Sequence, residues 1–318
     1  MKKKIMIAGA GILDVLVRPV ERDVFEKGSV PVETIQISTG GDALNEATVL
    51  ARLLEEENQV ELVTVLGKDR AGGTILEHCR KEGIGTELVI EEASLETGVN
   101  IVMVEKNGSR SFFTNPRSSL RKLALTHFPE KFPKETGIFC LASIFVSPKL
   151  GGSELAEIFE RAKMQGSCVC ADMTKCKNGE TVEDIREALA CLDYLFVNEE
   201  EAAMVTGKKQ PDDMAEEFLA CGVKTVLIKC GARGCYVKGK EAEGQFPAVP
   251  GTRCLDTTGA GDSFAAGFLC ALSEGRSLKE CIRWANTCGA LATEKTGACE
   301  GIQNRRQVLE RMKQWDRL

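Results

Sequence analysis

The sequence predicts an α/β protein: a central, mostly parallel β-sheet flanked by helices in three layers (Rossmann-like), with a small second β-sheet. Two observations predict this fold. Short apolar runs alternate with amphipathic segments along most of the chain, which implies right-handed crossovers between parallel strands. Two regions in the N-terminal third break this alternation. Since the 318 residues contain no internal repeat, low-complexity segment or linker, we expect residues 1–318 to form a single domain.

The alternation begins with an apolar strand at 5–9. The segment 42–54 follows as a helix, because its apolar residues recur on one face. The remaining elements of the large sheet are predicted in chain order as strands at 137–143, 168–172, 194–197 and 225–229, and helices at 155–164, 199–205 and 213–220.

The small sheet is predicted from four strands at approximately 12–18, 34–39, 97–105 and 109–115. No helix separates the first two. The last two flank Asn107-Gly108, a dipeptide suited to a tight hairpin because both residues tolerate positive φ. A small sheet placed there would act as a lid over a site at the carboxyl ends of the main strands. The alternative, that these strands extend the main sheet, stays open.

Composition excludes several classes of protein. A net charge of −6 argues against a nucleic-acid partner, which needs a concentrated basic face. Lys2 to Lys4 precede an apolar run, but Asp14 interrupts it, so a buried strand is expected there rather than a leader. We expect no membrane partner, since no apolar run approaches the roughly 18 residues needed to span a bilayer.

The fourteen cysteines do not have the spacing of a metal site. There is no C-x-x-C pair, and the only histidines are His78 and His127. Most of the thiols lie among aliphatic residues, where cysteine behaves as a small hydrophobe. A reducing cytoplasm is therefore the expected location.

Residues 256–262, Asp-Thr-Thr-Gly-Ala-Gly-Asp, carry the clearest chemical signal, and a helical pattern follows them. Gly259 and Gly261 let the backbone turn tightly and approach a ligand. The start of the helix then offers free amides and a positive dipole end to an anion such as a phosphoryl group. Asp262 is placed to take a proton from a hydroxyl beside that anion. The alternative is that Asp262 only caps the helix.

This run resembles the C-terminal signature of the ribokinase-like (PfkB) carbohydrate kinases, and the resemblance extends over essentially the whole chain. The resemblance implies a ribokinase-like fold with a β-sheet lid, ATP and Mg²⁺ as cofactors, a small sugar as substrate and a homodimer formed through the lid. It also implies that Asp262 is the catalytic base and that the backbone of Gly259, Ala260, Gly261 and Asp262 forms the anion hole.

The resemblance assigns substrate contacts as well. Residues 40–45, Gly-Gly-Asp-Ala-Leu-Asn, resemble the N-terminal signature, in which Gly41 and Asn45 contact the sugar. Asp14 matches an aspartate that binds substrate hydroxyls, and a carboxylate accepting two hydroxyl hydrogens is a suitable clamp. Ser143 lies in a segment similar to that of fructokinase-like members. Arg117 is placed to meet a substrate carboxylate or phosphate, or is equally a solvated loop charge.

Residues 198–201, Asn-Glu-Glu-Glu, match an N-x-x-E motif that organises magnesium and phosphates, with Glu201 acting through water. Alone, such a run is also typical of a helix start. The nucleotide-binding residues implied by the resemblance are Asn198, Lys229, Gly231, Arg233, Gly234 and Asn286. A loop that binds a monovalent cation such as K⁺ in many members, mostly through backbone carbonyls, is matched by Asp256, Thr258, Ala292, Lys295 and Gly297.

Other phosphate-binding motifs are absent. The sequence has no G-x-x-x-x-G-K-[ST], H-R-D or D-F-G motif. Gly9-x-Gly11 follows a strand as in a dinucleotide fingerprint, but Asp14 occupies the third glycine position. Phosphate binding therefore depends on the turn at 259–262.

The sugar itself stays open among ribose, fructose and 2-keto-3-deoxygluconate. Gly-Gly-Asp resembles the form in 2-keto-3-deoxygluconate kinases, whereas ribokinases usually have Gly-Lys-Gly-Ala-Asn after the first glycine; residues 172–175 also depart from the usual Asp-x-Asn. A nucleoside kinase of the same family is the first alternative, with Phe112 or Phe113, but not both, facing the base. A non-catalytic sugar-binding sensor is the second, although a sensor would not need Asp262.

Overall fold

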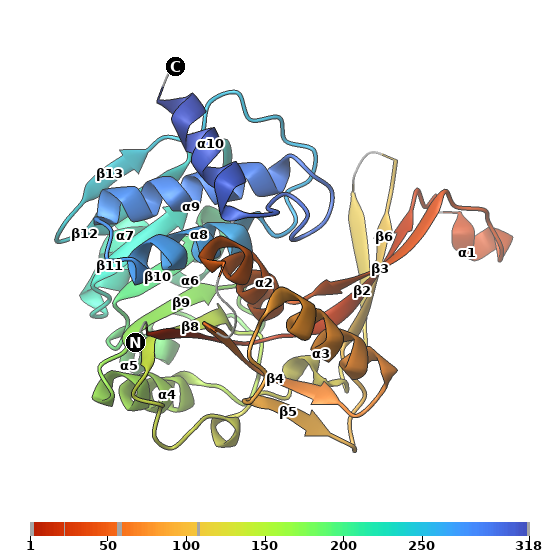
Figure 1. Cartoon of the computed structure of the whole chain (residues 1–318), viewed down its shortest axis with the longest axis horizontal. Helices are drawn as coiled ribbons and strands as arrows, with labels where there is room; N and C mark the ends of the chain where they lie inside the picture. Colours follow the sequence, from red (N-terminus) through yellow and green to blue (C-terminus); the bar gives the residue numbers. More distant parts are fainter. Residues whose placement is uncertain (1–2, 22, 56–58, 107–108, 317–318) are drawn as a thin grey trace.

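The computed structural model describes residues 3–21, 23–55, 59–106 and 109–316. Within these ranges, nine strands form one large sheet and four strands form a separate small sheet, which projects from the large one (Figure 1). The predicted fold class is confirmed, and the small sheet is not an extension of the large one. The predicted hairpin turn at Asn107-Gly108 lies outside the described residues.

The large sheet has the order β13-β12-β11-β10-β9-β8-β1-β4-β5. It is parallel from β11 to β5, and only β12 and β13 pair antiparallel at one edge. The sequence analysis did not predict β4, β5, β12 or β13. The strand bounds are β1 Lys4–Ala8, β4 Val60–Gly67, β5 Val89–Glu92, β8 Thr136–Ile144, β9 Cys168–Met173, β10 Tyr194–Asn198, β11 Thr225–Lys229, β12 Cys235–Gly239 and β13 Glu243–Phe246.

Helices cover both faces of the large sheet. In β1, Ile5 and Ile7 belong to one hydrophobic core while Met6 and Ala8 belong to the other, as expected for a strand buried on both faces. Five helices pack into the first core: α2 Asp42–Leu54, α3 Arg70–Glu82, α8 Ala260–Ser273, α9 Leu278–Thr293 and α10 Arg305–Trp315. Four pack into the second: α4 Gly152–Met164, α5 Arg186–Leu189, α6 Glu199–Thr206 and α7 Pro211–Ala220.

The small sheet has the order β3-β2-β6-β7, with bounds β2 Ile12–Arg18, β3 Thr34–Gly40, β6 Val99–Val104 and β7 Arg110–Thr114. The short helix α1 Val24–Lys27 lies between β2 and β3 in the chain. Each observed bound lies within two residues of the predicted one. Because side chains alternate along each strand, the small sheet has two distinct faces.

The register assigns residues to these faces. Val15 pairs with Ile37 and Ile101, and Ile101 pairs with Phe113, so these apolar side chains share one face, which we call the apolar face. Asp14 pairs with Asn100 on the opposite face, which we call the polar face. The polar face also carries Arg18, Arg110, Phe112 and Thr114.

Two further observations bear on the composition. All fourteen cysteines are free thiols. Among the described residues, no helix combines the length and the apolar character needed to cross a membrane.

Candidate active site

The glycine turn at the start of α8, residues 259–262, has no side chain at Gly259 or Gly261. Gly259 is the N-cap of α8 with φ of +69°, and a Cβ there would overlap the carbonyl oxygen of Ala298. At Gly261, a Cβ would lie 3.2 Å from the Lys229 ammonium nitrogen. The amides of Gly261 and Asp262 fall in the first helical turn, where no preceding helical carbonyl is available to them. The turn thus offers backbone donors, a helix dipole and a lysine to an anion.

Asp262 lies in this first turn and contacts a residue from the other end of the chain. The side-chain amide of Asn45, in α2, donates a hydrogen bond of 2.8 Å to Asp262 Oδ2. Burial, reinforced by the charge of Asp42, raises the pKa of Asp262 to about 8, although the Asn45 hydrogen bond and Lys229 oppose the shift. A carboxyl group with this pKa is suited to accept a proton near neutral pH.

Further carboxyl groups surround Asp262. Lys229 Nζ donates to both oxygens of Asp172, at 2.8 and 2.6 Å. Burial nevertheless raises the pKa of Asp172 to about 7, because it outweighs the attraction of Lys229. Glu46 is fully buried on α2, and its Oε1 has no hydrogen-bond partner in the described part of the chain. Burial, reinforced by Asp172 and Asp262, raises the pKa of Glu46 well above its usual value.

The predicted sugar-binding residues Asp14, Gly41 and Ser143 lie around the N-terminus of α2. Gly41 is the helix N-cap with φ of +93°. Ser143 donates a hydrogen bond to Asp42, the first residue of α2. Asp14 Oδ1 is buried and has no hydrogen-bond partner among the described residues, and burial raises the pKa of this carboxyl group. An unpaired buried acceptor is costly unless a ligand satisfies it.

A cavity of about 700 Å³ opens beside the glycine turn. Asn286 lines it and donates from its amide to the carbonyl of Pro247 at 3.1 Å. The other predicted nucleotide-binding residues that line this cavity are Asn198, Lys229, Gly231 and Gly234, together with Ala260 and Gly261 of the turn. Arg233 does not line it, because its exposed guanidinium pairs with Glu199.

Asn198 and Glu201 form a reciprocal capping box at the start of α6. The Glu201 amide donates to Asn198 Oδ1 at 2.9 Å, and the Asn198 amide donates to Glu201 Oε2 at 3.1 Å. Burial raises the pKa of Glu201, and Lys229 opposes the shift. Within the described ranges, no group of three or more His, Cys, Asp or Glu side chains is arranged to hold a metal by itself.

The charges around Lys229 show whether these residues suit the expected Mg²⁺. Asp42, Asp172, Glu201 and Asp262 all act on Lys229 or are acted on by it, so several buried carboxyl groups surround a single lysine. Such a surplus of oxygen ligands suits a hydrated divalent cation held through water and phosphate. The residues therefore fit a water-mediated Mg²⁺.

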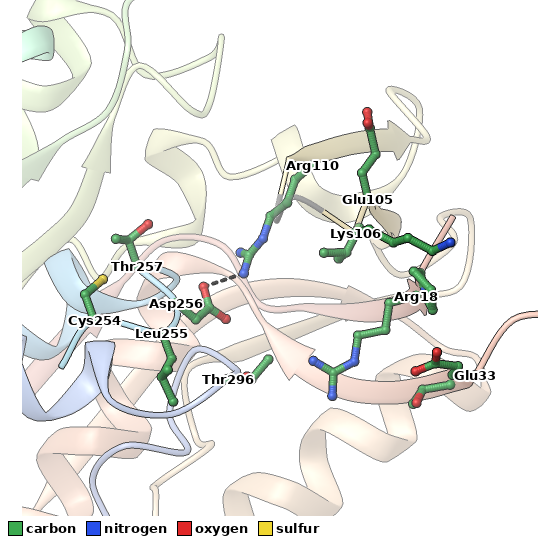
Figure 2. A pocket seen from close by; sticks show the side chains of 13 residues that line it. Arg18, Glu33, Glu105, Lys106, Arg110, Cys254, Leu255, Asp256, Thr257 and Thr296 are labelled. Atoms are coloured by element: carbon green, nitrogen blue, oxygen red, sulfur yellow. Dashed lines mark hydrogen bonds and ion pairs between the residues drawn. The ribbon is translucent and has the colours of Figure 1, made fainter. Parts of the chain in front are cut away.

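The predicted monovalent-cation loop is tied together by the carboxylate of Asp256. Its Oδ1 accepts hydrogen bonds from the Thr258 amide at 2.9 Å and the Thr258 hydroxyl at 2.7 Å. Its Oδ2 accepts from the Gly297 amide at 3.0 Å. Arg110 of the small sheet also pairs with Oδ1 (Figure 2). Of the other predicted members, Ala292 is buried in α9 and Lys295 is exposed.

Comparison with known proteins identifies the family of the chain. The family model described as pfkB family carbohydrate kinase matches residues 2–305. The chain belongs to this family. It is therefore a carbohydrate kinase, a phosphotransferase with an alcohol group as acceptor. The PfkB resemblance predicted from the sequence is confirmed.

Individual PfkB relatives differ in substrate. The chain is 30% identical to a ribokinase of Haemophilus influenzae, over 87% of this chain and 88% of the relative. It is 25% identical to a 2-dehydro-3-deoxygluconokinase of the same organism, over 86% of this chain and 92% of the relative. The solved structure of Arabidopsis thaliana ribokinase complexed with ribose and ATP superposes with a TM-score of 0.80 at 25% identity, covering 98% of this chain and 99% of that one.

Two predicted site residues of this PfkB kinase lie away from the Asp262 cluster. Arg233 pairs with Glu199, as described above. Arg117 is exposed on the loop after β7, and its backbone N–H donates a hydrogen bond of 3.0 Å to Asn115 Oδ1. The roles of the remaining predicted residues stay predictions.

The sequence analysis did not select four residues that the structure places at this site: Asp42, Glu46, Asp172 and Arg110. Signals existed for three of them. Asp42 and Glu46 flank Asn45 on a predicted helix, and Asp172 ends a predicted parallel strand, where ligand-binding residues gather. No local signal pointed to Arg110.

Proposed function

We propose that this chain is an ATP-dependent kinase that transfers the γ-phosphoryl group to a primary hydroxyl of a small sugar or sugar acid. The contact between Asn45 and Asp262 carries the proposal. It joins an amide suited to bind a sugar to an acid at the start of α8, beside a turn suited to bind phosphate. The adjoining 700 Å³ cavity is large enough for a nucleotide.

In this mechanism each residue has a defined task. Asp262 accepts the proton of the attacking hydroxyl, while Asn45 orients its carboxyl group through the 2.8 Å hydrogen bond. The amides of Gly261 and Asp262, with Lys229, stabilise charge on the transferred group. Mg²⁺, when bound, would neutralise phosphate charge, with Glu201 holding its water. Catalysis then rests on positioning and electrostatics.

The proposed substrates are ribose, fructose and 2-keto-3-deoxygluconate, or close relatives of them. The similarity to a ribokinase and a 2-dehydro-3-deoxygluconokinase supports this class. The unpaired, buried Oδ1 of Asp14 supports it too, because a sugar hydroxyl would satisfy that acceptor. A nucleoside kinase is the second candidate, since Phe112 lies on the polar face together with Asp14 and offers an aromatic surface to a base.

A substrate panel tests both candidates. ADP release would be measured with ribose, fructose, 2-keto-3-deoxygluconate and nucleosides, and the phosphorylated position would be mapped by NMR. Turnover of a sugar supports the proposal, turnover of nucleosides alone favours the second candidate, and sugar binding without ADP release indicates a sensor. Asp262→Asn serves as the matched control, since it should bind the preferred sugar without phosphorylating it.

We also propose that the enzyme is a cytoplasmic homodimer formed through the apolar face of the small sheet. Ile35 and Ile37 on this face are 68% and 64% exposed, and Phe113 is also exposed. An exposed apolar patch on a sheet favours association. The free thiols support a reducing compartment. Sedimentation velocity should show a dimer for the wild type and a monomer for Ile37→Glu; a wild-type monomer would exclude this assembly.

A further inference from the structure

An ion pair joins the small sheet to the loop before α8. Arg110 lies on β7, and its guanidinium contacts Asp256 Oδ1 across 146 residues of sequence (Figure 2). The two side chains are only 24% and 5% exposed. Screening by solvent is therefore weaker than for a surface ion pair.

Asp256 in turn organises the backbone that presents phosphate donors. It accepts hydrogen bonds from Thr258, immediately before the glycine turn, and from Gly297 on the facing segment. The neighbouring residue of that segment, Ala298, is the one against which Gly259 packs. Although burial opposes it, the hydrogen bonds from Thr258 and Gly297 and the charge of Arg110 lower the pKa of Asp256. The carboxylate is thus ionised and bound on both oxygens.

These contacts do not fit a monovalent cation at Asp256. Oδ1 already has three donors, one of them a guanidinium that is permanently charged. A second cation at the same oxygen would meet like charge at short range, and no solvent layer would separate the two. This loop differs in that respect from the cation-binding loop that the PfkB resemblance implies.

We propose that Arg110 supplies from the small sheet the positive charge that this loop would otherwise take from a monovalent cation, and so positions the glycine turn for phosphoryl transfer. Arg110 is then a positioning residue, which acts through Asp256 and contacts neither substrate. Because Arg110 belongs to the small sheet, the glycine turn is fully ordered only when the small sheet lies over the site. The inference rests on the proposed kinase function and adds the source of charge to it.

Arg18 provides a matched control. It lies on the same polar face of the small sheet as Arg110, and both residues line the same cavity of about 950 Å³ between this sheet and the Asp256 loop. Figure 2 shows Arg18 at that cavity, and the ion pair drawn to Asp256 comes from Arg110. Arg18→Gln therefore removes the same charge from the same cavity without breaking the pair with Asp256.

The experiment compares wild type, Arg110→Gln, Arg110→Lys and Arg18→Gln in potassium, sodium and tetramethylammonium chloride at equal ionic strength. We expect wild-type kcat to be the same in all three salts. Arg110→Gln should lose about tenfold or more in kcat with little change in sugar KM, because the turn is misplaced. Potassium should restore part of that loss. Arg110→Lys should retain most of the activity, and Arg18→Gln should behave as wild type.

A second readout does not depend on turnover. Potassium, relative to tetramethylammonium, should raise the Tm of Arg110→Gln and leave that of wild type unchanged. Potassium activation or selective stabilisation of the wild type would overturn the proposal. So would an Arg110→Gln variant that is indifferent to potassium, whether it is active or not. If no sugar is turned over, the proposed function fails, while the Tm comparison still decides the source of charge.

Discussion

The two sides of the site are built differently. On the large-sheet side, Asp172 and Lys229 lie on strands between the two hydrophobic cores, Asp262 lies on α8 in the first core, and the glycine turn packs against Ala298. On the small-sheet side, Asp14 and Arg110 stand on a four-stranded sheet whose apolar face is exposed in the monomer. The comparison shows that the proposed base and the phosphate-binding turn belong to the tightly packed large-sheet side, whereas the small sheet adds one predicted substrate contact, Asp14, and one fixed charge, Arg110.

The difference also has an electrostatic side. Burial raises the pKa values of Asp262 and Asp172 to about 8 and about 7, so the large-sheet side stores carboxyl groups that ionise reluctantly. On the small sheet, burial also raises the pKa of Asp14, whereas Arg110 contributes a permanent positive charge. Closing the small sheet therefore adds a positive charge to a region that already has an excess of acids.

Removing the acid on the large-sheet side should have the largest effect. Asp262→Asn should lower kcat by roughly 10²–10⁴-fold, the usual contribution of a general base. Sugar binding, measured by calorimetry, should change little because the amide still pairs with Asn45. Near-normal turnover would show that Asp262 is not the base.

The same variant carries a stability signature. The pKa of Asp262 is about 8 when folded and 3.8 by its ordinary value, so between these pH values the native state holds a proton that the unfolded chain has lost. Wild-type stability due to this group therefore falls as pH rises from about 4 to about 8. Asn cannot ionise, so the Tm of Asp262→Asn relative to wild type should increase from pH 5 to pH 8. A constant Tm difference would contradict the raised pKa.

Filling the glycine turn should have the next largest effect. Gly259→Ala introduces a Cβ that overlaps Ala298, so the amides of the turn must move, and kcat should fall roughly 10²-fold, as when an oxyanion donor is lost. Gly275→Ala is the control: its φ is +70°, nearly that of Gly259, but no atom lies within 4 Å of the added Cβ. That variant should lose some stability and little activity. Equal losses of kcat in both would refute a role for the packed turn.

Charge coupling within the cluster should shift a pH profile. Asp42 raises the pKa of Asp262, so Asp42→Asn should move the acidic limb of kcat/KM to lower pH. The amide can still accept the Ser143 hydrogen bond, which limits the structural change. Glu157→Gln, which removes an exposed carboxylate elsewhere, should leave the limb in place. A shift to higher pH for Asp42→Asn would contradict the coupling.

The large-sheet side was the more predictable from sequence. Residues 256–262 form a contiguous run whose glycines and acid have a local physical meaning, and the alternation of strands with helices gave the fold class. The strands at 60–67 and 89–92 and the antiparallel edge strands were not predicted. Strand β4 is buried on both faces, so its sequence shows no period-2 alternation. Strands β5, β12 and β13 are too short to give a clear pattern.

The small-sheet side was predictable only as strands. Their bounds follow from alternating patterns, but the contact between Arg110 and Asp256 depends on strand register and on the placement of one sheet against the other. Nothing near residue 110 in the sequence encodes that distance. Glu46 was missed for a related reason, because the sequence shows that it follows Asn45 but not that its carboxyl group is buried near Asp172 and Asp262.

The smallest expected effect separates the two faces of the small sheet. Phe112 is on the polar face with Asp14, and Phe113 is on the apolar face. The Phe113 ring packs edge-on against Phe25, with 6.4 Å between the ring centroids. Phe112→Ala should raise the sugar KM by roughly fivefold with kcat nearly unchanged, the loss of about 1 kcal/mol of binding contact. Phe113→Ala should leave KM alone and weaken the dimer in sedimentation. If Phe113→Ala raised KM and Phe112→Ala did not, the polar face would not be the one that meets the substrate.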